Sequence, residues 1–470
     1  MKSIWENDVI LSPREQKNDA GTKRKSDSNL TRKDIIVIGG GMTGILTAYF
    51  LQSRGRKVTV LEAGRIAGGQ TGRTTAKITS QHGLFYNKLI ENVGLEKAFA
   101  YAKANQEAIG EYAKMIWRYK ISCDFERLPS YLYSLQSSGQ LLQEAKVAES
   151  LGLPAHFAEQ VNLPFQTCGA VCFDNQAQFH PLKFLKTIAH ELEIYENTPV
   201  QKVRGNCVYT SKGMLMANKI VFATHYPIVD VPGFYFLRQH QERSYVVALA
   251  GCEKLDGMYY SEDDTGISLR SHKDILLVGG SSHRTGKNAD GGAYDTLRAA
   301  AAKYFPEGRE VAHWSAQDCM PHDEIPFIGQ YYYGKPDWYV ATGYKKWGMT
   351  SSMIAARLLT DLITGVENPY EKLFTPQRHL LKAVSGNFLM DVGESVKGLA
   401  GGWLTKRGGK DWNRVNGEVC PPRCSHLGCE LKWNPDERTW DCPCHGSRYD
   451  ANGKKLDEPT KEDLCRPRRE

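Results

Sequence analysis

The chain has 470 residues, of which 41% are hydrophobic, and its formal net charge is +7. This length suits two or three domains rather than one. Much of the excess charge lies in two short clusters, Lys23–Lys25 and Arg466–Arg469, so the composition excludes a broad basic surface or a nucleic-acid groove. No apolar run reaches the roughly 18 residues of a membrane span, and the start of the chain lacks the apolar stretch of a secretory signal. We therefore expect a cytoplasmic protein without a transmembrane segment.

The composition of the chain changes at Asp34. Residues 1–33 are polar and offer no periodic apolar face, which predicts a flexible arm. From Asp34 the sequence DIIVIGGGMTGILTAYFLQSRGRKVTVLEA follows the order strand, glycine turn, helix, turn and strand. This order predicts a βαβ unit.

The turn of this unit contains a G-x-G-x-x-G arrangement formed by Gly39, Gly41 and Gly44. The first glycine allows the tight turn, the second lets a pyrophosphate approach, and the third allows close helix packing. Glu62 ends the next strand, 18 residues after Gly44, where a carboxylate accepts hydrogen bonds from a ribose hydroxyl. The pattern indicates a dinucleotide site, with a plain glycine turn as the alternative, and it does not distinguish FAD from NAD.

Helical and strand-like stretches then alternate up to about residue 330, and the amphipathic segment MTSSMIAARLLTDLITG follows. This alternation predicts a mixed α/β body over residues 34–375. The pattern weakens over residues 376–395, which are expected to be a linker to a small terminal module at residues 396–470. No second complete glycine fingerprint occurs, so the sequence offers no nicotinamide site, and electrons are expected to come from an organic substrate.

The 12 cysteines are unevenly distributed, because six are scattered before residue 400 and six lie between Cys420 and Cys465. Within the second group, Cys424-x-His426 is followed after 15 residues by Cys442-x-x-His445. Two thiolates suit one iron, and two neutral imidazoles on a second iron raise the potential of the pair. A structural zinc site or a disulfide-only module are the alternatives.

The first part of the chain resembles the D-amino-acid oxidase and glycine oxidase group of FAD enzymes. The resemblance covers residues 34 to about 370 and is carried by GRIAGGQTGRTTAKITSQHG, KIVFATHYP and PFIGQYYYGKPDWYVATGYKKWGMTSSMIAARLLTDLI. It implies an α/β Rossmann-type FAD-binding domain with an interleaved α+β substrate domain. It also implies that the loop Gly69–Thr75 and the segment Gly343–Thr350 approach the flavin, and that a valine contacts the adenine. The corresponding residues are Thr71, Arg73, Thr74, Val200, Gly343, Gly348, Met349 and Thr350.

The terminal motif is similar to that of the Rieske proteins of quinol-oxidising respiratory complexes. This resemblance implies a small all-β domain, a 2Fe-2S cluster on the four ligands above, and a disulfide between Cys429 and Cys444. It places the hydroxyls of Ser447 and Tyr449 as hydrogen-bond donors to cluster sulfur, which stabilises the reduced state. Two departures are evident, since the stretch before the first ligand loop lacks apolar alternation and Glu458-Pro459-Thr460 replaces a Gly-Pro-Ala-type loop.

Together the two resemblances predict an FAD-dependent enzyme that dehydrogenates a C–N bond of an amino acid or secondary amine. Electrons would pass through the cluster to an unidentified acceptor. An oxygen-using oxidase with a structural cluster and a redox-sensing protein without an organic substrate are the alternatives. A Rieske oxygenase is not indicated, because no 2-His-1-carboxylate iron site accompanies the cluster. The sequence assigns no catalytic residue; four histidines stand beside loops that could face the flavin, namely His82, His225, His283 and His322.

Overall fold

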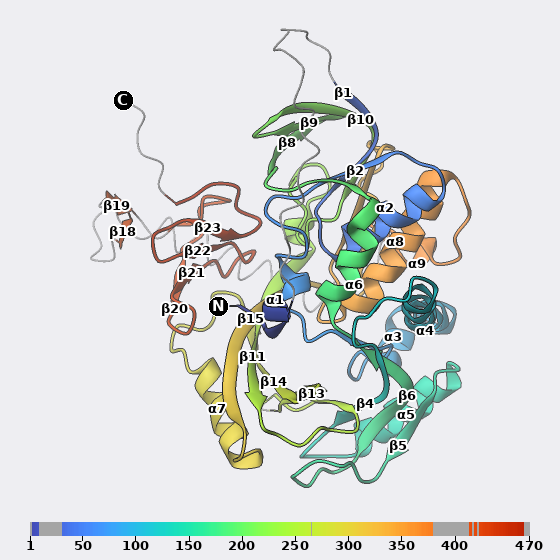
Figure 1. Ribbon diagram of the computed structural model, residues 1–470, viewed down its shortest axis with the longest axis vertical. Helices are drawn as coiled ribbons and strands as arrows, with labels where there is room; N and C mark the ends of the chain where they lie inside the picture. Colours follow the sequence, from blue (N-terminus) through green and yellow to red (C-terminus); the bar gives the residue numbers. More distant parts are fainter. Residues whose placement is uncertain are drawn as a thin grey trace.

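The computed structural model describes residues 2–8, 31–264, 266–378, 413–415, 418–420 and 423–464. These residues form two large sheets with packed helices and a small all-β module at one side (Figure 1). Most of the predicted linker, residues 376–395, lies outside the described part. Among the residues described, no helix is long and apolar enough to cross a bilayer.

The first sheet contains the predicted βαβ unit. β1 (Thr31–Ile38) and β2 (Val58–Leu61) are parallel neighbours, and α2 (Met42–Ser53) connects them. Ile35 to Ile38 are buried because β1 is central, which explains their continuous β-branched run. The strand order is β16-β17-β10-β1-β2-β7, with β8 and β9 attached beyond β10. The other strands are β7 (Glu193–Tyr195), β8 (Val200–Arg204), β9 (Cys207–Thr210), β10 (Gly213–Phe222), β16 (Phe327–Gln330) and β17 (Trp338–Thr342).

Helix α8 (Gly348–Thr364) lies against α2, as the predicted amphipathic segment requires. Small side chains allow the two helices to approach, and Thr43 donates a hydrogen bond to Ser352 across the contact (2.9 Å). The long helix α4 (Leu95–Arg118) packs on α8, and α9 (Glu371–Phe374) packs beside β16. Further helices are α3 (Tyr86–Val93), α5 (Gly139–Ser150), α6 (Pro181–Ile188) and α7 (Ala293–Tyr304).

The second sheet forms the interleaved domain and has the order β15-β11-β14-β13-β12-β4-β6-β3, with β5 paired to β6. Its long strands β11 and β15 are antiparallel over their whole lengths, and α7 covers β11 and β14. The bounds are β3 (Lys77–Ile78), β4 (Glu126–Tyr133), β5 (Ala155–Ala158), β6 (Ala170–Gln178), β11 (Gln239–Ala250), β12 (Met258–Ser261), β13 (Ser268–His272), β14 (Ile275–Arg284) and β15 (Arg309–Pro321).

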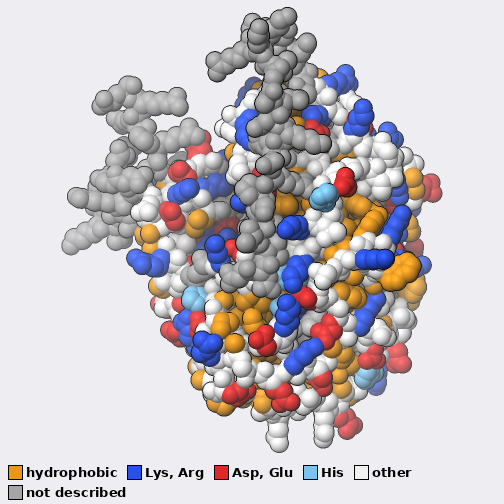
Figure 2. All heavy atoms as spheres, viewed as in Figure 1, with side chains coloured by type: hydrophobic (Ala, Val, Ile, Leu, Met, Phe, Trp, Pro, Cys, Tyr) orange, Lys and Arg blue, Asp and Glu red, His pale blue; other side chains and the backbone are white. Residues whose placement is uncertain are grey.

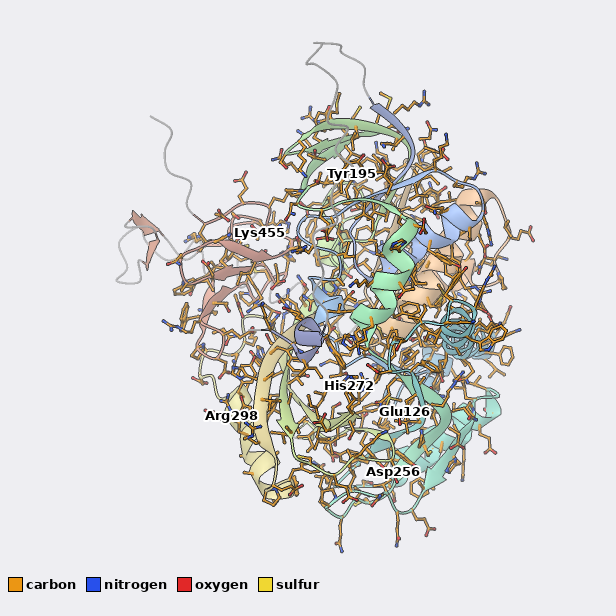
Figure 3. The ribbon with its side chains drawn as sticks, viewed as in Figure 1. Glu126, Tyr195, Asp256, His272, Arg298 and Lys455 are labelled. Carbon is orange, nitrogen blue, oxygen red and sulfur yellow. A yellow bond between two sulfur atoms is a disulfide. The ribbon has the colours of Figure 1, made fainter. Side chains whose placement is uncertain are left out.

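The prediction of a flexible arm over residues 1–33 is wrong for its first residues. Helix α1 (Ile4–Asp8) is packed into the main core, where Trp5 is fully buried and lies edge-on to His272 (4.8 Å between ring centroids), a residue labelled in Figure 3. The segment is too short to show a helical period, so its burial depends on contacts with distant residues. Strand β1 also begins before Asp34, at Thr31.

The terminal module contains a four-stranded antiparallel sheet in the order β20-β21-β22-β23. Its strands are β20 (Lys432–Asn434), β21 (Thr439–Asp441), β22 (Arg448–Asp450) and β23 (Lys455–Asp457). The described part of the stretch without apolar alternation forms a separate two-stranded ribbon, β18 (Asn413–Val415) with β19 (Glu418–Cys420). The module therefore places its two cysteine-histidine loops at the ends of very short strands.

Candidate functional site

The glycine turn after β1 leaves the first turn of α2 open to a ligand. Gly39 has φ +110°, and a Cβ there would lie 2.3 Å from the Ala223 carbonyl oxygen. A Cβ on Gly44 would lie 1.9 Å from the Gly39 carbonyl oxygen, so only glycine lets the helix sit this close to the turn. Gly41 caps α2 without a side-chain hydrogen bond. The Met42 N–H donates to the Thr71 hydroxyl oxygen (3.0 Å). The positive end of the helix dipole here suits a pyrophosphate.

Glu62 lies at the end of β2, beside this turn. Its carboxylate accepts hydrogen bonds from the backbone N–H groups of Gly40 (2.7 Å) and Gly64 (2.8 Å). Burial raises the pKa of Glu62, and these two backbone donors oppose the rise. Each carboxylate oxygen has a further lone pair for a ribose hydroxyl.

A cavity of about 1420 Å³ extends from the glycine turn between the two large sheets. It exceeds the roughly 300–1,000 Å³ of common small-molecule sites, as a dinucleotide together with a substrate requires. Its wall contains nine of the residues predicted to bind the cofactor: Gly39, Gly41, Glu62, Thr71, Arg73, Thr74, Val200, Gly348 and Met349.

The other three predicted residues do not line the cavity but pack against residues near it. Gly44 packs on the turn, as described above. Gly343 has φ +76° and lies against Pro321 and Gln239. Thr350 is buried and donates to the Thr79 carbonyl (3.3 Å). Their contact with a flavin remains a prediction.

The four predicted iron ligands lie in the small module, where Cys424 and Cys442 share one buried cluster and the rings of His426 and His445 lie edge to face (5.2 Å between centroids). Cys424 and Cys442 are 3% and 1% exposed, and His445 is 2% exposed. The Nδ1 atoms of His426 and His445 are buried and have no hydrogen-bond partner within the part of the chain that the structure describes, which is costly for a ring nitrogen unless a metal binds there. Two thiols with two unpaired imidazole nitrogens fit a cluster with sulfur on one iron and nitrogen on the other.

Hydrogen bonds and a disulfide fix the two ligand loops. Cys429 and Cys444 are bonded, and this disulfide joins the loop of Cys424 to the loop of Cys442. The Tyr449 hydroxyl lies 3.5 Å from the Cys424 sulfur. Hydrogen bonds from Cys442, Ser447 and Tyr449 lower the pKa of the Cys424 thiol, which favours the thiolate that iron requires. The Ser447 hydroxyl also accepts the Thr460 N–H (3.1 Å).

Comparison with known proteins agrees with both sites. Residues 34–362 match the family described as FAD dependent oxidoreductase (DAO). The chain belongs to this FAD-dependent oxidoreductase family. Residues 413–466 also match the Rieske [2Fe-2S] domain, so FAD and a Rieske cluster are its cofactors.

Three relatives illustrate the range of similarity. The Rieske 2Fe-2S iron-sulfur protein YhfW of Bacillus subtilis is 35% identical over 91% of this chain and 92% of its own length. The gamma-glutamylputrescine oxidoreductase of Escherichia coli is 24% identical over 71% of this chain and 84% of its own length. The glycine oxidase structure from Geobacillus kaustophilus has a TM-score of 0.63 at 16% identity, covering 74% of this chain and 99% of its own, and thus shares the fold.

In this flavoprotein the cavity wall contains a group of aromatic rings around His82, one of the four histidines noted in the sequence. His82 stacks on Trp347 (4.8 Å between ring centroids), and Tyr260 lies edge-on to the same indole. Burial lowers the pKa of His82 to about 3, so its ring is neutral, and its nitrogens contact the Tyr101 hydroxyl and the Thr79 carbonyl. Of the four histidines noted in the sequence, His82 and His225 line the cavity.

Lys77 is another wall residue without a sequence signal, since a lysine in a short strand looks like any surface lysine. Its ammonium hydrogen-bonds the Ser268 hydroxyl and has no carboxylate partner among the described residues. Burial, aided by the nearby charge of Arg270, lowers the pKa of Lys77 to about 7. The cavity therefore contains a cation that an acidic ligand could neutralise.

The Rieske module supplies one wall of the same cavity. Six residues of β23 and the following loop line it: Lys455, Leu456, Asp457, Glu458, Lys461 and Glu462. Figure 3 labels Lys455 at the edge of the module that faces the first sheet. The flavin site and the iron-sulfur module thus share one cavity wall. Neither sequence motif indicated this arrangement.

Proposed function

We propose that this protein dehydrogenates a C–N bond of an amino acid or a secondary amine and passes the electrons from reduced FAD through the Rieske cluster to an acceptor. The observation that carries the proposal is the cavity wall shared by the flavin fingerprint and the Rieske module. When bound, FAD accepts a hydride from the carbon of the C–N group while the nitrogen loses a proton, which leaves a C=N bond, and the cluster accepts electrons singly. The acceptor is unidentified, and the proposed compartment is the cytoplasm.

The chemistry of the wall supports an amine substrate that carries an acidic group. The His82, Trp347 and Tyr260 rings offer an apolar surface, and neutral His82 adds no competing positive charge. Lys77 can pair with a substrate carboxylate. The names of two relatives, glycine oxidase and gamma-glutamylputrescine oxidoreductase, refer to substrates of this general kind.

The direction of electron flow follows from ligand chemistry. Imidazole ligands and hydroxyl donors raise the potential of an iron-sulfur cluster toward the upper part of the about −150 to +300 mV range. The Tyr449 hydroxyl, 3.5 Å from the Cys424 sulfur, would be such a donor. A cluster of this potential is an acceptor for reduced flavin rather than a donor to it.

An anaerobic panel of amino acids and their decarboxylated amines, followed at the flavin absorbance and by electron paramagnetic resonance of the cluster, tests the function. We expect flavin bleaching followed by the Rieske signal. Bleaching with a cluster that stays oxidised would favour an oxygen-using oxidase. A panel that bleaches nothing would favour a redox-sensing protein.

Lys77→Met in the same panel tests the carboxylate contact. The ammonium is present below pH 7 and lost as the pH rises through about 7, so acidic substrates should bind the native enzyme more weakly above that pH. The variant should bind them weakly at all pH values, while exposed Lys146→Met should behave as native. Equal binding of acids and decarboxylated amines by the native enzyme would contradict this role.

A further inference from the structure

The histidine side of the Rieske site is covered by the flavin-binding part of the chain. The His426 side chain is 5% exposed, and its Nε2 lies 3.0 Å from an Asp230 carboxylate oxygen. The Phe236 ring lies edge-on to both ligand rings, at 6.1 Å from His426 and 5.6 Å from His445. Both imidazole edges therefore meet protein rather than solvent.

A chain of glutamines, of which Gln241 and Gln317 are buried, links the cluster loop to the flavin cavity. Gln70 lines the cavity and accepts a hydrogen bond from the Gln317 backbone N–H (2.8 Å). The Gln317 side-chain amide donates to Gln241 (2.6 Å) and to the Gly446 carbonyl (2.9 Å). The Gln241 amide in turn donates to the carbonyl of the ligand His445 (2.8 Å). Gln241 also donates to the Glu458 carbonyl (2.9 Å), so both donors of each buried amide, Gln241 and Gln317, are paired. Such amides specify one arrangement of the groups that they join.

The Rieske module also packs so closely on the flavin-binding part of the chain that it cannot move freely against it. A Cβ on Gly286 would lie 2.6 Å from the Pro443 nitrogen, and a Cβ on Gly446 would lie 2.6 Å from the Gln241 Cβ. Arg243, which is fully buried, forms an ion pair of 2.6 Å with Glu437 of the module. Separating the two parts would expose this pair and break the glutamine contacts.

We propose that the histidine edge of the Rieske centre is an internal electron port, permanently docked on the flavin-binding part of the chain and closed to outside partners. The direction of flow rests on the proposed function. With both cofactors bound, one electron of the reduced flavin would reduce one ferric ion of the cluster to ferrous, and the proton of the flavin would pass to solvent. The second electron follows once an outside one-electron acceptor has reoxidised the cluster. That acceptor must dock on a face of the module other than the histidine edge.

Chemical modification of the holoprotein tests whether the port is closed. Diethyl pyrocarbonate acylates imidazole nitrogens that solvent reaches, and His190, whose side chain is 79% exposed, is an internal control. Peptide mapping should show modified His190 with His426 and His445 unmodified while the Rieske signal is intact. Modification of either ligand at a rate similar to that of His190 would overturn the proposal.

Photoreduction tests whether the port is fixed. Light with a deazaflavin, with oxalate as the consumed electron donor, reduces the flavin without any amine, so a failed substrate panel leaves this test intact. The rate at which the cluster becomes reduced by flavin should be unchanged when sucrose raises the viscosity. A rate that falls in proportion to viscosity would show a swinging module and refute docking.

The glutamine chain can be tested separately with Gln241→Met. This positioning variant should slow flavin-to-cluster transfer severalfold and shift the midpoint potential of the cluster, because the His445 loop loses its donor. Exposed Gln143→Met is the matched control and should change neither. Native transfer and native potential in Gln241→Met would contradict a role of the chain in the port.

Discussion

At the scale of single residues, the iron site depends on two kinds of polar atom. The histidine Nδ1 atoms are buried without a partner among the described residues, and the Tyr449 hydroxyl lies beside the Cys424 sulfur. The sequence predicted the ligands and Tyr449, because their spacing is local. It could not predict Asp230, which lies far from His426 along the chain and contacts it only through the fold. The same limit applies to Lys77, whose low pKa arises from burial.

Tyr449→Phe tests the hydroxyl donor. Its loss removes a hydrogen bond near the Cys424 sulfur, worth about 1 kcal/mol net, so the reduced cluster should be destabilised. For one electron this corresponds to a midpoint potential about 40 mV lower. A redox titration followed by electron paramagnetic resonance measures the shift. The exposed Tyr333→Phe should leave the potential unchanged, and an unshifted Tyr449→Phe would remove the assigned role.

At the scale of elements, the βαβ unit could be predicted and helix α1 could not. β1, α2 and β2 follow from periodicity and glycine placement within a short stretch. Helix α1 is stable only because distant residues enclose it: the Trp5 indole donates to the Thr74 carbonyl (2.7 Å), and the Ser3 hydroxyl donates to the Gly72 carbonyl. Both acceptors belong to the loop that lines the flavin cavity. The N-terminal segment thus holds that loop in place by hydrogen bonds to its backbone.

Trp5→Ala should therefore weaken FAD binding. Truncating a buried tryptophan costs about 3–5 kcal/mol of stability, and the loop also loses its hydrogen bond at Thr74. We expect the FAD dissociation constant to rise by roughly tenfold, which is about 1.4 kcal/mol. Flavin fluorescence on release measures it. Trp117→Ala, at a side chain 84% exposed, is the control, and equal FAD retention by both variants would rule out this support.

At the scale of the whole molecule, two motifs that the sequence shows as separate modules share one interface. Their docking could not be predicted, because it depends on complementary surfaces and not on a local pattern. Asp436 of the module, for example, accepts hydrogen bonds from the Gly292 and Ala293 N–H groups at the start of α7. On the face seen in Figure 2, basic and acidic side chains are interspersed, so the described residues there form no extended basic surface.

Arg243→Met tests how strongly this interface holds the module. The guanidinium is fully buried and pairs with Glu437, which also contacts Arg448. Removing one partner of a buried pair costs about 3–5 kcal/mol, because the other charge loses compensation. The Rieske signal should then be lost at a lower temperature than the flavin domain unfolds, giving two transitions in place of one. Arg298→Met removes an ion pair of a 42% exposed arginine with Glu310 and should cost about 1 kcal/mol or less. Indistinguishable melting of the two variants would mean that Arg243 does not hold the module in place.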